Sequence, residues 1–175
     1  MTEEQMQSSQ TETGTGNPGK AESGSRKNAE TPKEGGKSVS ILSANTTALA
    51  YLGDAVYEVF IREYVLKDGG VHVDRLNKKA IQFVRADSQA AIVREMIETG
   101  FLTDEEEGLV KRGRNHTNTS RPRGSSPMQY KWATGFEALI GYLYQAGLRD
   151  RLEEVISRAV EIGERQQKEG RGSGK

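Results

Sequence analysis

The chain has 175 residues, contains no cysteine, and balances 25 basic residues against 25 acidic ones. Disulfides and thiolate metal sites are therefore excluded, and the net charge by itself predicts no charged partner. No apolar run approaches the roughly 20 residues that span a bilayer, and the N-terminus lacks the apolar core of a secretory signal. These features predict a cytoplasmic protein with no membrane partner.

The two ends of the chain differ in composition from its middle. Residues 1–40 contain no aromatic residue and almost no large aliphatic one, so they have too little apolar surface to form a core. We expect a disordered polar tail over 1–40 and a second, short tail over 166–175. A single domain over 41–165 remains, which is an ordinary size for one hydrophobic core.

The domain is predicted to be all-α. Apolar residues recur at helical spacing, and neither an alternating strand pattern nor an Asn-Gly or Asp-Gly turn occurs. Thr103 and Glu106 form the T-x-x-E pattern of a capping box, which predicts the start of a helix. The expected helices cover about 44–66, begin near Asp74, near Asp87 and after Thr103, and cover about 128–145 and 149–165.

A long connection without helical periodicity runs from Arg114 to Pro127. Connections of this length in compact domains tend to be functional. The segment 111–131 holds six Lys or Arg residues and no acid, which suits a polyanion. A solvated loop is the alternative, and basic runs are more often of that kind. The residues expected to contact phosphates are Lys111, Arg112, Arg114, Asn115, Arg121, Arg123 and Lys131.

Two acids interrupt the most apolar helices. Asp54, in the stretch YLGDAVYE, shares a helical stripe with Tyr57 and Ile61. Glu137 lies at the edge of the apolar stripe of GFEALIGYLY, one turn after Thr134. Both positions are predicted to be poorly solvated, where an ionised acid is costly unless it has a partner.

The residues alone leave the partner of these acids open. Asp54 could be a helix N-cap, with Gly53 breaking the pattern before it, and Glu137 could pair with an arginine. Taken together, the acids instead suggest an oxygen-ligand site for Mg²⁺, in which water supplies most of the coordination. Beside a basic loop, such a site would indicate a nuclease.

At these same residues the chain resembles the ribonuclease III family. LAYLGDAVYE is similar to the family signature, and GFEALIGYLY is similar to its second acidic motif, with Glu137 in the glutamate position. Their order, helical setting and separation also fit, and the similarity covers 41–165. The resemblance implies the helical endonuclease fold of that family, a homodimer, and cleavage of double-stranded RNA.

Three departures narrow the resemblance. Ala50 and Thr47 stand where the full-length enzymes have glutamates, and Thr134 stands where the second motif usually has an aspartate. After Ile162 no room remains for the RNA-binding domain that usually follows. Together with KRGRN, these features resemble the Mini-ribonuclease III subfamily. That resemblance implies trimming of the 23S ribosomal RNA precursor in a double-stranded stem, with a ribosomal protein as a candidate partner.

Carried over by position, Asp54 and Glu137 become the catalytic and metal-binding acids, with Mg²⁺ as the cofactor. Scissile phosphate oxygens and water would complete the coordination shell, and the products would be 5′-phosphate and 3′-hydroxyl ends. Tyr51 occupies the place of an aromatic at the family's dimer contact, with ordinary core packing as the alternative. The basic segment 111–131 would bind RNA in place of the missing domain.

Two rival functions use the same sequence. One is a catalytically silent RNA-binding protein on the same fold, and the other is a helical interaction module in which the acids are caps. Retention of both Asp54 and Glu137 argues against the silent binder, because RNA binding does not require acids at poorly solvated positions.

Overall fold

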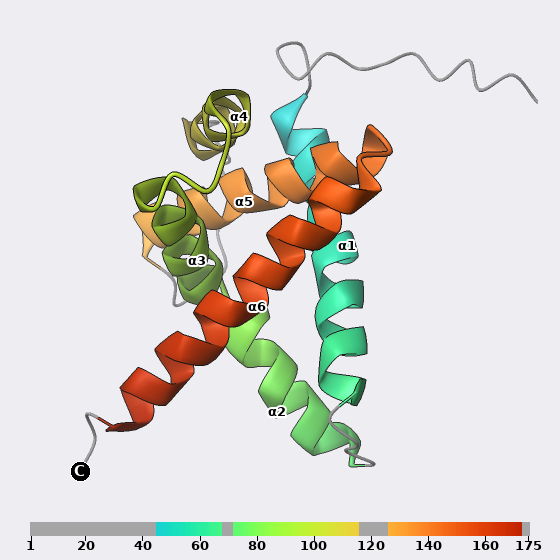
Figure 1. Cartoon of the computed structure of the whole chain (residues 1–175), viewed down its shortest axis with the longest axis vertical. Coiled ribbons are helices and arrows are strands. Elements are labelled where there is room, and N and C mark those ends of the chain that lie inside the picture. The colour runs from blue at the N-terminus through green and yellow to red at the C-terminus, as the bar shows by residue number, and fades with distance from the viewer. Residues whose placement is uncertain (1–44, 68–71, 116–125, 173–175) are drawn as a thin grey trace, which may run out of the picture. The chain divides into compact units, whose positions relative to one another are not determined.

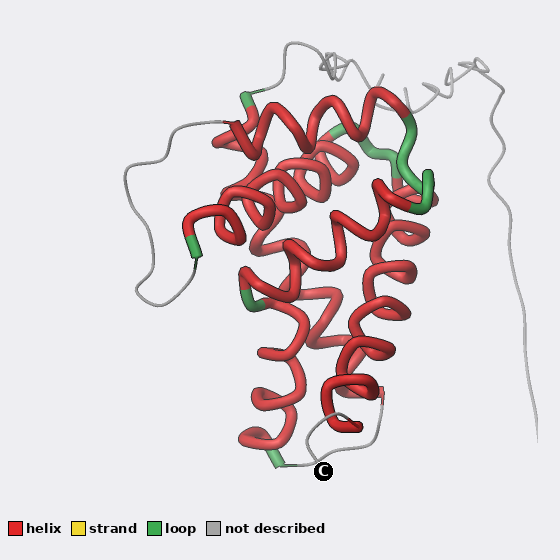
Figure 2. Tube along the Cα trace, turned by 90° about the vertical axis from the view of Figure 1, so that its left-hand side faces the viewer, coloured by secondary structure: helices red, strands yellow, loops and turns green. Residues whose placement is uncertain are grey.

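The computed structural model describes residues 45–67, 72–115 and 126–172, with side chains up to 170. These residues all belong to one compact unit, 37–175. They form helices and short turns without any strand, so the all-α prediction is confirmed for this part of the chain (Figure 2). The helices are α1 (Thr46–Lys67), α2 (Val73–Val84), α3 (Ala86–Glu98), α4 (Asp104–Asn115), α5 (Pro127–Gln145) and α6 (Arg149–Gly172).

Side chains outside the helices fix where two of them begin. Asn45 caps α1, because its Oδ1 accepts hydrogen bonds from the backbone N–H groups of Thr47 and Ala48 at 3.1 and 3.2 Å. The predicted capping box is present at the start of α4. Thr103 Oγ1 accepts from the N–H of Glu106 at 3.2 Å, and Glu106 Oε2 accepts from the N–H of Thr103 at 2.9 Å.

α5 is the central helix of this unit. It makes its most extensive contacts with α1 and also packs on α3 and α4, while α6 crosses in front of it (Figure 1). Its residue Phe136 is fully buried and meets the ring of Tyr57 from α1 edge to face, with ring centroids 5.0 Å apart. Because α5 contacts α1, α3, α4 and α6, its residues lie close to several elements at once.

Arg151 at the start of α6 joins that helix to the start of α4. Its Nε donates to Glu106 Oε1 at 2.9 Å, and its Nη2 donates to Glu106 Oε2 at 2.8 Å. Nη2 also donates to the carbonyl of Phe101, and the guanidinium lies over the Phe101 ring, 4.7 Å from its centroid. A bidentate pair of this kind fixes both distance and orientation.

The last helix is longer than expected. α6 continues to Gly172, so the tail expected from residue 166 is helical for most of its length. Arg165 pairs with Glu95 of α3, and Lys168 lies 3.9 Å from Glu164 one turn before it. These pairs, in a stretch rich in good helix formers, explain the extra turns. The predicted tail over 1–40 lies outside the described residues.

Across the part of the chain that the structure describes, no helix combines the length and the apolar character needed to cross a membrane.

Candidate active site

α1 and α5 cross with their backbones in contact. A Cβ added to Gly53 would overlap the carbonyl oxygen of Glu137, and one added to Gly141 would overlap the carbonyl oxygen of Leu49. Only glycine allows this approach at both positions. Asp54 directly follows Gly53, so the crossing places its carboxylate near that of Glu137, close enough for the two charges to interact. The structure therefore brings together the two acids that the sequence singled out.

The two acids differ in exposure, and one expectation fails. Glu137 is partly buried, but Asp54 is exposed, so the predicted poor solvation of Asp54 is wrong. The buried stripe of α1 is centred on Gly53, Val56 and Tyr57, which places Asp54 at its edge. The N-cap alternative is also wrong, because Asp54 lies in the interior of α1.

The surroundings of Glu137 disfavour its charge. Burial and the nearby charge of Asp54 raise the pKa of Glu137 to about 8, against a lowering effect of a hydrogen bond from Gln89. An arginine partner for Glu137 was the structural alternative. Within the described residues Glu137 forms no ion pair, so that alternative is not supported. Near neutral pH this acid therefore holds its proton unless a cation takes the proton's place.

The pKa of Asp54 is raised as well. Although the residue is exposed as a whole, partial desolvation of its carboxylate raises its pKa, and the charge of Glu58, one turn further along α1, adds to the effect. Glu58 has its own cation, since Arg62 Nη2 lies 2.8 Å from its Oε2. Among the described residues, Asp54 and Glu137 form a pair of acids without a basic partner, an arrangement that a divalent cation would neutralise.

The number of protein ligands at this pair is small. No cluster of three or more His, Cys, Asp or Glu side chains suited to a metal ion occurs in the described ranges. Two positions that are acidic in the full-length ribonuclease III enzymes supply no acid here. Ala50 is buried, and the hydroxyl of Thr134 donates to the carbonyl of Tyr130 at 3.0 Å within α5. Neither can act as an anionic ligand beside Asp54 and Glu137.

The predicted phosphate-binding residues that the structure describes lie at the end of α4 and the start of α5. Arg114 lies over the ring of Trp132, 4.5 Å from its centroid, and its Nε donates to Asn115 Oδ1 at 3.2 Å. Lys111 pairs with Glu107 within α4, and Lys131 is exposed on α5. Arg112 lies in the last turn of α4, while Arg121 and Arg123 fall outside the described residues.

Close packing of α4 on α5 links these basic residues to the acid pair. A Cβ on Gly113 of α4 would come within 3.0 Å of the Cα of Gly135, which itself faces Val110. Two residues after Gly135 comes Glu137. Successive turns of α5 thus contact the basic end of α4 and the acid-bearing part of α1.

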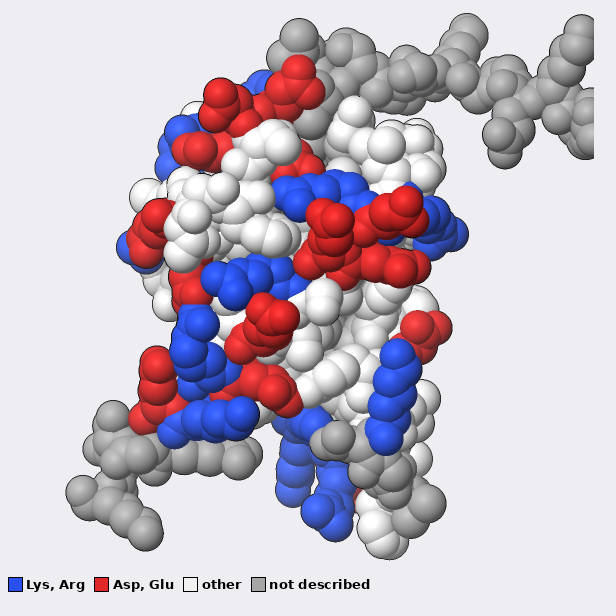
Figure 3. Space-filling model, viewed as in Figure 1, with Lys and Arg blue, Asp and Glu red and all other residues white. Residues whose placement is uncertain are grey.

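The face of α6 provides a contrast in charge. In the view of Figure 3, basic and acidic side chains alternate over this helix. Arg151 pairs with Glu154 at 2.8 Å and Arg158 with Glu161 at 3.1 Å, each one turn apart. The part of this face that the structure describes therefore lacks the single-sign surface that binds polyanions.

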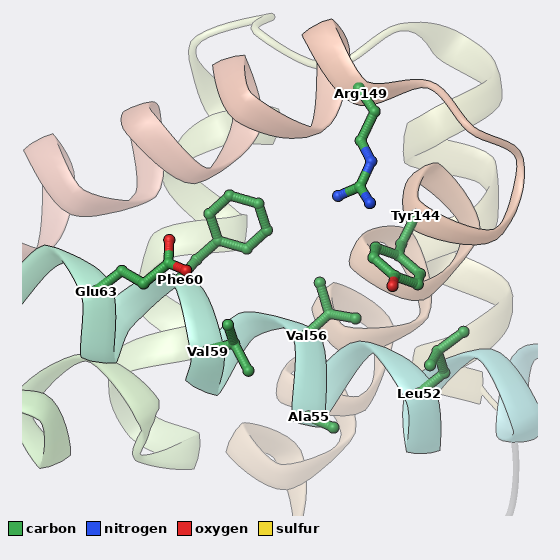
Figure 4. A pocket seen from close by; sticks show the side chains of 8 residues that line it. All are labelled: Leu52, Ala55, Val56, Val59, Phe60, Glu63, Tyr144 and Arg149. Atoms are coloured by element: carbon green, nitrogen blue, oxygen red, sulfur yellow. The ribbon is translucent and has the colours of Figure 1, made fainter.

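An apolar groove of about 330 Å³ lies beside the other edge of α1. Figure 4 shows Leu52, Val56 and Phe60 rising from α1 toward Tyr144 of α5 and Arg149 of α6. Tyr51, on the same helix, is 86% exposed, so the alternative that it packs in the core is wrong. Val59, which also lines the groove, is 54% exposed.

Sequence reasoning missed two residues near the acids, Glu58 and Gln89. Gln89 is 1% exposed on α3, within an apolar stripe that continues through Ile92, Val93 and Met96. A polar residue within such a stripe is the same signal that pointed to Asp54, so the pattern could have found it. Glu58 gave no such signal, because an acid followed by Arg62 at i+4 is typical of a solvated face.

A sequence profile of the ribonuclease III domain matches residues 47–147. This match spans more than half of the chain and includes Asp54 and Glu137. The chain therefore belongs to the ribonuclease III family.

Within that family, the similar proteins are named Mini-ribonuclease 3. The one from Symbiobacterium thermophilum is 46% identical over 119 residues, which cover 68% of this chain and 90% of the relative. The one from Clostridium tetani is 43% identical over 132 residues, with 74% and 86% covered. A crystal structure of a Fusobacterium nucleatum protein matches with a TM-score of 0.60 and 32% identity, covering 69% of this chain and 95% of that one. The chain is thus a member of the Mini-ribonuclease 3 group.

Proposed function

We propose that this protein is a Mg²⁺-dependent endoribonuclease that cleaves double-stranded RNA, acting in the cytoplasm on a stem of the 23S ribosomal RNA precursor. The observation that carries the proposal is the pair formed by Asp54 and Glu137 at the crossing of α1 and α5, where the main chains touch and the charge of Asp54 raises the pKa of Glu137. Membership of the ribonuclease III family supports the same reaction, and the relatives' name supports an RNA substrate.

Asp54 and Glu137 would hold the Mg²⁺ ion. Carboxylate oxygens are the ligands that this ion prefers, and its charge would relieve the repulsion between the acids. The bound ion would activate water for attack on phosphorus and would stabilise the developing negative charge, and the products would carry 5′-phosphate and 3′-hydroxyl ends. With so few protein acids, water and phosphate oxygens from the RNA would complete the coordination shell.

The basic residues at the α4–α5 connection would hold the RNA. Arg112, Arg114 and Lys131 lie on the two helices that pack together beside Glu137. Double-stranded RNA presents phosphates and 2′-hydroxyls along a shallow groove, so recognition by these side chains would depend on shape more than on sequence. Binding would release counterions condensed on the RNA phosphates, and this release becomes less favourable at high salt. The affinity should therefore fall steeply as the salt concentration increases.

A two-fold dimer would give one acid pair for each RNA strand. The support is the apolar edge of α1, where Tyr51 and Val59 are exposed beside a groove. Exposed apolar side chains gathered next to a groove are typical of a protein interface. In such an arrangement Tyr51 of each copy would contact the other copy.

The deciding experiment is incubation of the purified chain with a stem-containing 23S precursor RNA, with and without Mg²⁺. Wild type should cut the stem only when Mg²⁺ is present, and Asp54→Asn should bind the RNA but cut it at least a hundredfold more slowly, because a metal ligand is lost. Cleavage by Asp54→Asn at the wild-type rate would contradict the catalytic assignment. Binding without cleavage by both proteins would favour the silent RNA-binding function instead.

The dimer has its own test. Sedimentation equilibrium should give a dimer for wild type and a monomer for Tyr51→Ala combined with Val59→Asp. Glu153→Ala, an exposed acid of α6, serves as the control and should stay dimeric. A monomeric wild type at micromolar concentration would remove the paired-site proposal while leaving the acid pair intact.

A further inference from the structure

The guanidinium of Arg114 is held in one orientation by two neighbouring side chains. It lies over the ring of Trp132, 4.5 Å from the ring centroid, and its Nε donates to Asn115 Oδ1 at 3.2 Å. Trp132 is itself partly buried and packs against the hydrophobic core, so its ring is a fixed support. A cation over an indole face is attracted by the electrons of the ring in addition to the packing contact. Arg114 therefore has a preferred orientation although it lies in the last turn of α4.

Arg151 shows what a stacked arginine does when its partners belong to the fold. Its guanidinium lies 4.7 Å from the centroid of the Phe101 ring, a stack that matches that of Arg114. All three of its nitrogens donate within the chain, and the acceptors are Glu106, Glu154 and the carbonyl of Phe101. Arg114 uses Nε alone. Within the described residues its Nη1 and Nη2 donate to no acceptor and form no ion pair, so they are available to a ligand.

The surroundings of these two nitrogens favour an anion. The segment 111–131 contains no acidic residue, and the close approach of Gly113 to Gly135 holds the end of α4 against α5. Lys111 differs from Arg114, because it pairs with Glu107 within α4. Two N–H groups in one plane match two oxygens of a phosphate group, which a lysine ammonium cannot do. A backbone phosphate of RNA is therefore the ligand that this arginine fits.

We propose that Arg114 binds one phosphate of the RNA backbone through Nη1 and Nη2, and that Trp132 is a positioning residue that orients the guanidinium for this contact. The inference rests on the proposed function. Trp132 and Glu137 both stand on α5, and the five positions between them correspond to about 7.5 Å along the helix axis. A phosphate held at Arg114 therefore keeps a constant offset from the acid pair before and during cleavage.

The test is a double-mutant cycle on binding of the stem-containing 23S precursor RNA, measured in EDTA so that no cleavage occurs. Arg114→Lys keeps the charge but loses the planar fork, and Trp132→Leu keeps the arginine but removes its support. Each change should weaken binding by about five- to tenfold. Because both act on one contact, Arg114→Lys in the Trp132→Leu background should change the affinity by less than about twofold.

Further measurements separate positioning from folding. Trp132→Phe keeps an aromatic face and should recover most of the affinity that Trp132→Leu loses. With Mg²⁺, Trp132→Leu should raise KM and leave kcat within about twofold, because the contact is the same in the ground state and the transition state. Arg114→Gln should reduce the slope of log affinity against log salt by about one, as expected for the loss of one phosphate contact.

Phe101→Leu is the matched control, because it removes the aromatic support of an arginine whose nitrogens are used within the fold. It should lower the melting temperature and leave RNA affinity unchanged. An equal loss of affinity in Phe101→Leu and Trp132→Leu would mean that destabilisation explains the effect, and would overturn the positioning role.

The remaining outcomes also decide the matter. Additive effects of Arg114→Lys and Trp132→Leu, or binding by both within twofold of wild type, overturn the positioning role, while binding and cleavage by wild type keep the proposed function standing. An unchanged salt slope in Arg114→Gln overturns the phosphate contact. A wild type that does not bind the RNA removes the proposed function itself, and this inference with it.

Discussion

Glu106 and Glu137 are both glutamates that helices hold partly away from water, yet their surroundings act on them in opposite directions. Burial raises the pKa of Glu106, but hydrogen bonds from Arg151 and Thr103 and the charge of Arg151 outweigh that effect, so its pKa lies below the ordinary value. Burial and the charge of Asp54 raise the pKa of Glu137, and the bond from Gln89 lowers it only in part.

The difference shows that the partners of a buried acid, rather than its burial, indicate its role. Glu106 is the less exposed of the two, at 6%, and its oxygens are saturated by donors from this chain. Glu137 lies near another acid, and no basic side chain among the described residues pairs with it. The first arrangement stabilises the fold, and the second is suited to an external cation.

The largest expected effect comes from neutralising the acid that lacks a cation. Glu137→Gln should reduce the cleavage rate by about a thousandfold, because a metal ligand contributes several kcal/mol to the transition state. Its melting temperature without metal should not fall, since the raised pKa keeps Glu137 uncharged near neutral pH and glutamine has nearly the same shape. Single-turnover cleavage and thermal melting measure the two effects. If Glu137→Gln cleaves at the wild-type rate, Glu137 is not a metal ligand and does not differ in role from Glu106.

The next effect concerns the crossing that brings the acids together. Gly53→Ala inserts a methyl group against the main chain of Glu137 and should destabilise the protein by about 3 kcal/mol, with loss of cleavage. In Gly108→Ala, in α4, the new methyl group would meet only the end of the Arg112 side chain, at 4.0 Å, and the change should be neutral or stabilising by up to about 1 kcal/mol. Urea unfolding separates the two, and equal effects would mean that the crossing is not tight.

Removing the charge of Glu106 should affect stability alone. Glu106→Gln loses the bidentate bond to Arg151 and should cost about 2 to 3 kcal/mol in the free energy of unfolding. Cleavage per folded molecule should stay at the wild-type rate, because Glu106 contacts neither acid of the site. A selective loss of cleavage in a fully folded sample would contradict the structural role.

The two acids should make the free energy of unfolding depend on pH with opposite signs. The pKa of Glu137 is raised from 4.5 to about 8, so its contribution to the stability of the metal-free protein is present at low pH and lost as pH rises toward 8. Glu106, with its lowered pKa, contributes above the ordinary value of 4.5 and loses that contribution in acid.

Metal binding should report the shift of Glu137 directly. Because Mg²⁺ must displace the proton, its affinity should increase with pH by up to about tenfold per unit and level off above about 8. Calorimetric titrations over this range measure it. An affinity independent of pH would show that Glu137 is already ionised in the free protein.

Local patterns predicted much of this molecule. Helical periodicity gave the all-α class, and the spacing of Thr103 and Glu106 gave a capping box that the structure contains. Polar residues within apolar stripes pointed to Asp54 and Glu137. The helix class and the capping box are confirmed because each depends on residues a few positions apart along one helix. The roles of Asp54 and Glu137 stay predictions.

The remainder depends on contacts between distant segments. No spacing could assign Arg151 to Glu106, since 45 positions separate them. The same holds for Gln89 beside Glu137, and for the exposure of Asp54, which the edge of the α1–α5 contact determines. Sequence reasoning treated Gly53 as a break in a helix, whereas its role is to let a second helix approach.

The touching backbones at Gly53 and Gly141 also set how the site responds to heat. The two acids stand on main-chain atoms already in contact, so their spacing does not depend on how neighbouring core side chains repack. Thermal motion that loosens the ends of the helices leaves that spacing unchanged. Catalytic activity should therefore persist up to the temperature at which α1 and α5 separate, and then disappear together with the fold.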